Sequence, residues 1–145
     1  MRSFQTSIEV REGQSGTIYL RVEDENGDPV VKAAIDAIEL DLYKVNGAVV
    51  INGREHISVL DVNGGEYFDT LQSGVDENGA AVSYNFRWGF TPWDTPFLGE
   101  DDAAHQTEKH VAHFRVIWDT GEQAIAHEVV MVVTNFRRFA VEETT

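Results

Sequence analysis

Hydrophobic and polar residues alternate along most of this chain, which is the period-two pattern of half-buried β-strands. In the segment 17–23, for example, Ile18, Leu20 and Val22 face one side and polar neighbours face the other. The pattern predicts strands near residues 6–10, 17–23, 38–43, 49–51, 57–62, 66–71, 82–90, 111–118 and 124–133. No stretch keeps the 3.6-residue period of a helix over three turns, and residues 33–40 are the main ambiguity.

Turn signals separate these segments and predict antiparallel connections. Asn-Gly pairs occur at residues 26–27, 46–47, 52–53, 63–64 and 78–79, and Asn-Gly is the strongest short hairpin signal. Many short strands with turns between them indicate a sandwich or a barrel. We favour an all-β antiparallel sandwich because the strands are uneven in length. We expect one domain over residues 1–145, with short flexible termini.

Composition narrows the class of protein. The 145 residues carry a net charge of -14 and no cysteine, so disulfides and thiol chemistry are excluded. Such acidity makes nucleic acid and anionic membranes poor partners, because phosphate binding needs clustered lysine and arginine. Met1–Val10 lacks a basic region followed by an apolar run, so we expect no secretory signal. The longest purely apolar run is too short to cross a membrane.

The segment 91–109 interrupts the rhythm of strands and is expected to be a long loop. Loops of this length are uncommon and are often functional. The residues that we single out as candidate partner contacts are Pro92, Trp93, Pro96, Phe97, Asp101 and Asp102. Aromatic residues among polar ones suit protein interfaces. The alternative is a loop folded back on the end of the sandwich, with its aromatic side chains covering the core.

Candidate metal sites in the sequence are weak. His110 and His113 lie three apart on a predicted strand, so their side chains face opposite sides and cannot share one ion without a bulge. The Asp24, Asn26, Asp28 spacing is similar to the start of a calcium loop, but Ile35 stands where the required glutamate would be. We therefore expect ordinary turns and no metal or cofactor.

Candidate catalytic groups are also weak. No serine or threonine stands in a nucleophile elbow, and no glycine-rich phosphate loop is present. With 25 acidic residues, a pair at glycosidase spacing carries no information. The row Tyr84, Phe86, Trp88 and Phe90 could be a sugar-stacking platform, but such spacing along a strand favours the inner face of the core. We expect no enzyme activity.

Several segments between residues 49 and 136 resemble small structural proteins of tailed-bacteriophage virions. The segments are Ile51-Asn52-Gly53-Arg54, Val59-Leu60, Asn63-Gly64-Gly65, Pro92-Trp93-Asp94, Glu108–Trp118, Glu128-Val129 and Val133–Phe136. In addition, Gly16–Val30 is similar to the opening strand and turn of immunoglobulin-like modules. The resemblance implies an immunoglobulin-like sandwich.

The same resemblance implies a non-enzymatic part of a virion, assembled in the bacterial cytoplasm. The expected role is a capsid decoration or cement protein on the outside of the head. Its partners would be the major capsid protein or other virion proteins, with self-association on the particle. A neck or tail protein is the alternative within the same particle. A carbohydrate-binding module that uses Trp93 as its platform is the alternative from another class.

Overall fold

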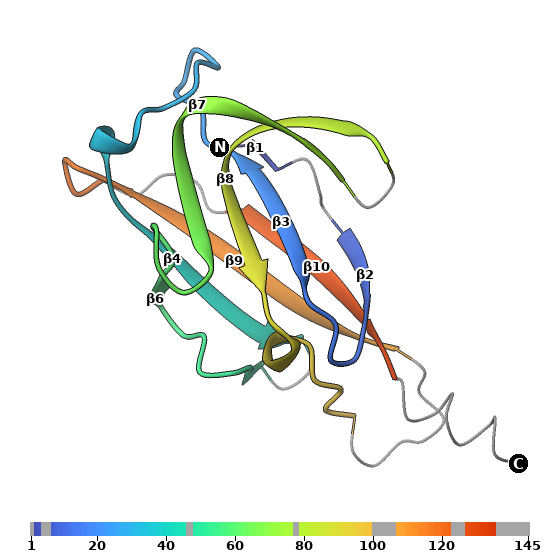
Figure 1. The fold of residues 1–145 in the computed structure, drawn as a ribbon. Helices are drawn as coiled ribbons and strands as arrows, with labels where there is room; N and C mark the ends of the chain where they lie inside the picture. The colour runs from blue at the N-terminus through green and yellow to red at the C-terminus, as the bar shows by residue number, and fades with distance from the viewer. Residues whose placement is uncertain are drawn as a thin grey trace, which may run out of the picture.

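The computed structural model describes residues 2–3, 7–45, 48–76, 79–99, 107–122 and 127–135, and they form two packed β-sheets (Figure 1). The strands are β1 (Arg2–Ser3), β2 (Ser7–Arg11), β3 (Gly16–Arg21), β4 (Ile35–Lys44), β5 (Val49–Val50), β6 (Ile57–Ser58), β7 (Gly65–Val75), β8 (Ala81–Phe90), β9 (Thr107–Trp118) and β10 (His127–Thr134). The short 3-10 helices η1 (Lys32–Ala34) and η3 (Pro92–Asp94) lie in the described connections. Within this part of the chain, no helix is long and apolar enough to cross a membrane.

The two sheets differ in size and in how the N-terminal strands join them. The smaller sheet has the order β1-β3-β8-β7, and the larger has the order β2-β10-β9-β4-β5, with β6 also paired to β4. The pairs are antiparallel except β2 with β10, which is parallel. Since β1 pairs with one sheet and β2 with the other, the start of the chain bridges both layers. The predicted all-β sandwich is confirmed.

The core lies between the inner faces, where the alternating apolar residues meet. Phe114 of the larger sheet makes edge contacts with two rings of the smaller one, Phe86 at 6.0 Å and Trp88 at 5.9 Å between ring centroids. The predicted inward rows are buried in both sheets, and they include Ile18, Leu20, Val22, Ile38, Leu40 and Leu42. One continuous hydrophobic cluster joins these rows. Burial of apolar area on both inner faces therefore holds the layers together.

Tyr84 departs from its predicted row. Phe86, Trp88 and Phe90 belong to the core cluster, whereas Tyr84 is buried outside it, against Tyr19 at 4.7 Å and Phe68 at 6.0 Å between ring centroids. The β7–β8 register shifts between Tyr67 and Gln72. Tyr84 is therefore buried, as the row predicted, but it packs with Tyr19 and Phe68 and is not part of the continuous core cluster.

The side chain of buried Asn85 lies at this irregularity and hydrogen-bonds to the backbone of Val22, which follows β3. Its side-chain oxygen accepts the Val22 N–H at 2.7 Å, and its amide donates to the Val22 carbonyl at 2.9 Å. The amide thus satisfies two backbone groups where the β3 ladder has ended. A buried polar side chain is tolerated here because its hydrogen bonds are made.

Several boundaries differ from the sequence expectation. Strand β7 (Gly65–Val75) runs past the expected 66–71, and β6 (Ile57–Ser58) is shorter than the expected 57–62. The ambiguous segment 33–40 contains the end of η1 and the first part of β4, so it is mostly strand. Strand β9 begins at Thr107, so residues 107–109 of the expected loop are strand. The earlier start of β4 lengthens the strand pair β4–β9, which runs from Ile35 opposite Trp118 to Lys44 opposite His110. The earlier start of β9 lengthens the pair β9–β10, where residues 107–109 lie opposite residues 134–132.

Candidate functional site

Trp93 stands on a short turn at one end of the sandwich, shown below β8 in Figure 1. Its side chain is 78% exposed, the highest value among the large hydrophobic residues that the structure describes. The neighbouring Pro92 is also exposed, whereas Asp94 and Thr95 are fully buried. The turn therefore presents one face to solvent and anchors the other.

A capping box fixes the local shape of this turn. The Asp94 carboxylate accepts the Thr91 backbone N–H at 2.8 Å and the Thr91 hydroxyl at 3.1 Å, and the Asp94 N–H donates to the Thr91 carbonyl at 2.9 Å. Pro92 follows the N-cap, where its missing N–H costs no helical hydrogen bond. This arrangement satisfies the groups that a helix start leaves unpaired.

Asp94 also joins the turn to a distant part of the chain. Its carboxylate accepts the Asn52 amide at 2.8 Å and the Arg54 Nε at 3.0 Å, with Arg54 Nη2 at 3.4 Å. Burial alone would raise the pKa of Asp94, but the hydrogen bonds from Arg54, Asn52 and Thr91 outweigh it and lower the pKa. A buried carboxylate with this many donors remains charged and holds both segments.

The left-handed backbone at Asn52 and Gly53 brings the two donors to Asp94. Their φ values are 53° and 65°, a region that glycine and asparagine tolerate better than other residues. The N–H of Arg54 then donates to the Ile51 carbonyl at 3.0 Å, which closes the turn. Consequently the segments 51–54 and 92–94 meet in one hydrogen-bond network.

A third segment secures the other side of the Trp93 turn. The Thr95 hydroxyl donates to the Gln14 carbonyl at 2.8 Å, and the Gly13 N–H donates to the Thr95 carbonyl at 2.9 Å. Gly13 and Gln14 belong to the loop between β2 and β3, which passes from one sheet to the other. Trp93 is therefore held relative to both sheets, and its backbone is largely ordered before any partner binds.

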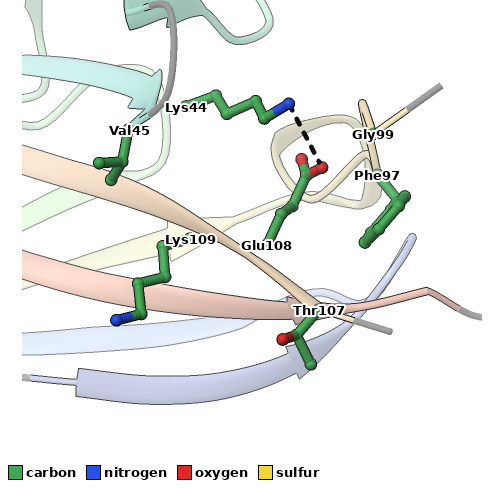
Figure 2. Close-up of a pocket in the computed structure, with 7 residues that line it drawn as sticks. All are labelled: Lys44, Val45, Phe97, Gly99, Thr107, Glu108 and Lys109. Atoms are coloured by element: carbon green, nitrogen blue, oxygen red, sulfur yellow. Dashed lines mark ion pairs between the residues drawn. The ribbon is translucent and has the colours of Figure 1, made fainter. Parts of the chain in front are cut away.

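A cavity of about 430 Å³ lies between the end of β4, the start of β9 and the segment that follows the Trp93 turn. It is lined by Lys44, Val45, Phe97, Gly99, Thr107, Glu108 and Lys109 (Figure 2). Lys44 and Glu108 point toward each other in Figure 2, with Nζ 3.9 Å from Oε1, while Lys109 points away. The Leu98 N–H donates to Glu108 Oε2 at 2.9 Å, so the chain after the Trp93 turn is fixed to β9.

Fully buried His110 lies next to this cavity and shares a hydrogen bond with Glu108. Burial is the main cause that lowers the pKa of His110, and it exceeds the opposing effect of Glu108. The second ring nitrogen, Nδ1, has no hydrogen-bond partner, so no hydroxyl is paired with this histidine as a nucleophile–base pair requires. His110 and Glu108 thus form a polar pair of side chains beside the cavity.

The predicted contact residues divide between two environments. Trp93 and Pro92 face solvent, while Pro96 and Phe97 are half-buried and Phe97 packs against the core cluster. The packing of Phe97 against the core cluster favours the alternative interpretation of the loop for this residue, and its half-exposed ring leaves the predicted partner contact a prediction. Asp101 and Asp102 lie outside the described residues.

His110 and His113 face opposite sides of β9, as the sequence predicted. His110 is buried on the inner face, whereas His113 lies near Asp41, with 3.9 Å between Nδ1 and Oδ2. The part of the chain that the structure describes contains no group of three or more histidine, aspartate or glutamate residues that could hold a metal ion.

The aspartates of the calcium-like segment stabilise their own turn. Asp24 Oδ1 accepts the backbone N–H groups of Asn26 at 2.9 Å and Asp28 at 3.0 Å, which is the ordinary turn chemistry of aspartate. Asp76 accepts the Ala80 N–H at 2.9 Å in the same way. Asp24 and Asp76 therefore have a structural role, since each accepts backbone hydrogen bonds within its own turn.

Asn52, Arg54 and Asp94 form a hydrogen-bond network in this candidate site that sequence reasoning did not identify. The Thr91–Asp94 spacing with Pro92 between them is a recognisable N-terminal capping signal, and it could have indicated a fixed turn. Nothing in the sequence pairs residue 94 with residues 52 and 54, since more than 35 residues separate them.

Comparison with known proteins adds no relative to this picture: no family model, no curated protein and no solved structure matches the chain.

Proposed function

We propose that this chain is a non-enzymatic structural protein of a tailed-phage virion, which decorates the outside of the head and binds its partner through Trp93. The observation that carries the proposal is the 78% exposure of Trp93 on a turn whose buried side is fixed by Asp94. A solvent-facing tryptophan contributes little to folding. It is, however, the residue type most enriched among the energetic centres of protein interfaces.

Pre-ordering of the turn supports a binding role. A partner that encloses Trp93 does not have to order the backbone, and this removes part of the entropic cost of association. Many copies on one particle would each contribute a modest contact. The virion setting comes from the sequence resemblance, and the resembling segments 51–54 and 92–94 are those that build the turn.

Strand order supports the finer description of the fold as immunoglobulin-like. The orders β1-β3-β8-β7 and β10-β9-β4-β5 correspond to the ABED and GFCC′ orders of immunoglobulin-type sandwiches. Fold alone assigns no function. A rigid sandwich nevertheless suits a protein that acts as a platform for surface contacts.

The test is co-sedimentation of the purified protein with heads of the phage that encodes it. We expect binding by the wild type, a large loss with Trp93→Ala and no loss with a matched Val31→Ala change, because Val31 is also exposed, at 51%, but lies on the β3–β4 connection. Higher salt should strengthen binding by screening repulsion between acidic copies. Equal binding by the Trp93→Ala variant, or affinity that falls as salt rises, would contradict the proposal.

A carbohydrate-binding module is the second candidate, because an exposed tryptophan can also stack on a sugar ring. A glycan array separates the two functions. A carbohydrate-binding module should bind defined glycans and lose that binding with Trp93→Ala, whereas a decoration protein should bind heads and show no glycan signal. Binding at the neck or tail by electron microscopy of labelled particles would support the alternative position on the virion.

A further inference from the structure

The exposed edges of the two sheets are protected to different degrees. Within the described residues, the edge strands are β1, β2, β7 and the β5–β6 side of the larger sheet. Strands β1, β5 and β6 have two residues each, and β2 carries the exposed charged residues Glu9 and Arg11. Short strands and charged side chains are the usual protection against edge-to-edge pairing. Strand β7, with 11 residues, is the long edge that remains.

The last five residues of β7 have neither form of protection. Residues 71–75 are Leu-Gln-Ser-Gly-Val and carry no charge in a chain of net charge -14. Leu71 is 37% exposed and Val75 is 60% exposed, and Ser73 between them is exposed as well. These three residues alternate along the strand, so their side chains share one face. Gly74 faces the other way, where an added Cβ would meet the ring of Tyr84 at 3.0 Å.

The hairpin register shows which backbone groups are free at this edge. The Asp76 N–H donates to the Ala80 carbonyl, and Gly74 is opposite Val82 and Gln72 opposite Tyr84. Hydrogen-bonded pairs alternate in an antiparallel ladder, so residues 72 and 74 bond to β8. The N–H and C=O groups of Ser73 and Val75 therefore point away from β8, toward the open edge, and Leu71 lies just before them at the register shift of β7.

We propose that this edge of β7 pairs with the same edge of a second copy of the chain. The two strands run antiparallel about a two-fold axis at Ser73, which places Leu71 opposite the partner's Val75. Ser73 then lies opposite the partner's Ser73. Ser73 and Val75 have outward-pointing N–H and C=O groups, so the Ser73 pair is a hydrogen-bonded one and Val75 offers the same groups to the partner's Leu71. The smaller sheet becomes continuous across both molecules, as in strand addition.

The sequence of this edge is self-complementary, which identifies the occupant as a second copy. An isologous contact requires the same surface patch on both molecules. Leu71 and Val75 are equally far from Ser73, so each Leu71 lies opposite a Val75 across the axis. Aliphatic pairs directly opposite each other stabilise a sheet. The absence of charge in residues 71–75 also leaves no like charges opposed within the paired stretch, despite the acidic surface elsewhere.

The contact is small, so we expect a weak dimer in solution. A five-residue edge buries less than the ~1,600 Å² of a standard interface, and the whole molecules repel through their net charge of -14. Salt should therefore favour the dimer, because it screens this repulsion. Copies held side by side on a surface would pair more readily, through their higher effective concentration. The pairing does not involve Trp93 and does not depend on the partner of that residue.

Sedimentation velocity over a concentration series, up to about millimolar and at low and high salt, tests the pairing. We expect a monomer of 16.2 kDa in exchange with a species of twice that mass, which increases with salt. Ser73→Pro should weaken the dimer by roughly tenfold or more, since it removes two outward N–H donors from each dimer. It should leave the β8 ladder intact, because proline is tolerated where a strand N–H faces outward. A single 16.2 kDa species throughout, or an undiminished dimer with Ser73→Pro, overturns the proposal.

A charge-matched pair of variants covers the case in which Ser73→Pro does not fold. Leu71→Lys with Val75→Lys places like charges opposite each other across the axis and should abolish the dimer, although it reduces the overall repulsion. Glu9→Lys changes the net charge by the same two units on the β2 edge and should preserve or strengthen the dimer. Loss of the dimer with Glu9→Lys and its retention with the double lysine variant would place the contact on β2 instead.

The absence of cysteine permits a direct test of the register. Opposed residues in a hydrogen-bonded antiparallel pair have Cα atoms ~5.5 Å apart, which is within disulfide range. Ser73→Cys should give a covalent dimer on mild oxidation, faster than Glu9→Cys under the same conditions. Equal rates of cross-linking would contradict pairing about Ser73.

Discussion

Trp88 and Trp93 lie five residues apart in the sequence and occupy opposite environments. Trp88 is fully buried, stacks edge-on against Phe114 at 5.9 Å between ring centroids, and donates its indole N–H to the Asn63 carbonyl at 3.1 Å. Trp93 is 78% exposed, and the polar contacts of its turn are made by the neighbouring residues. One tryptophan stabilises the fold, and the other is presented by it.

The difference lies in the backbone that carries each ring. Trp88 belongs to β8, whose alternation directs it into the core. Trp93 belongs to η3, where Asp94 takes the buried position and leaves the tryptophan outside. The Trp93 side chain is thus available for binding because the neighbouring Asp94, and not Trp93, makes the buried contacts that hold the turn. Four predictions test this contrast, in order of decreasing effect on stability.

Trp88→Ala should have the largest effect. Removal of a buried tryptophan loses apolar burial and leaves a cavity, which together cost about 3–5 kcal/mol of unfolding free energy. Urea unfolding followed by circular dichroism measures the loss. A cost below about 1 kcal/mol, in the range of ordinary surface changes, would mean that Trp88 does not organise the core.

Arg54→Ala should come next and should act on the Trp93 turn. The change leaves the buried Asp94 carboxylate without its only cationic partner among the side chains bonded to it, and breaking such a pair costs about 3 kcal/mol. Glu55→Ala, at an exposed neighbouring position, is the control and should cost less than about 0.5 kcal/mol. Urea unfolding of both variants gives the comparison, and equal costs would show that the ion pair does not hold the turn.

Lowering the pH should weaken the turn before the core. Because the pKa of Asp94 is lowered from 3.8 in the folded protein, the unfolded chain binds the proton more readily. The stabilisation is therefore complete above about pH 3.8 and is lost as the pH falls toward the lowered folded value. Acid titration of stability for the wild type and Asp94→Asn measures this contribution. An unchanged slope below pH 3.8 in the variant would contradict it.

Trp93→Ala should have the smallest effect on stability, within about 0.5 kcal/mol, because its side chain buries little area. Urea unfolding in parallel with Trp88→Ala provides the contrast. A cost comparable with that of Trp88→Ala would show that Trp93 packs in solution, and the binding role proposed for it would then lose its support.

The strands and the inner rows were predictable because they depend on local rules. Rows such as Ile38, Leu40 and Leu42 alternate with polar residues, so the inward face follows from geometry. Tyr84 was not predictable in this way, since it has the same spacing as Phe86 and Trp88. Its position depends on the register shift in β7, which the sequence of β8 does not contain.

The candidate site was predictable only in part, and for a similar reason. An exposed Trp93 follows from an unusual loop with two prolines, but the packing of Phe97 against the core cluster does not. Phe97 lies where the chain after η3 passes over the open end of the core, and this path is set by the Leu98 bond to Glu108. Contacts of this kind join segments on different strands, and periodicity carries no information about them.

The sequence by itself therefore determined the all-β class, most strand positions, the inward apolar rows and the turns with their aspartates. These features depend on neighbours within a few residues, through side-chain alternation and turn chemistry. Only the tertiary structure decided that Asn52 and Arg54 meet Asp94, that Tyr84 leaves its row, and that the end of β7 is an unprotected edge. Each of these depends on which distant strands pair and in which register, and that choice is made by burial of the whole core.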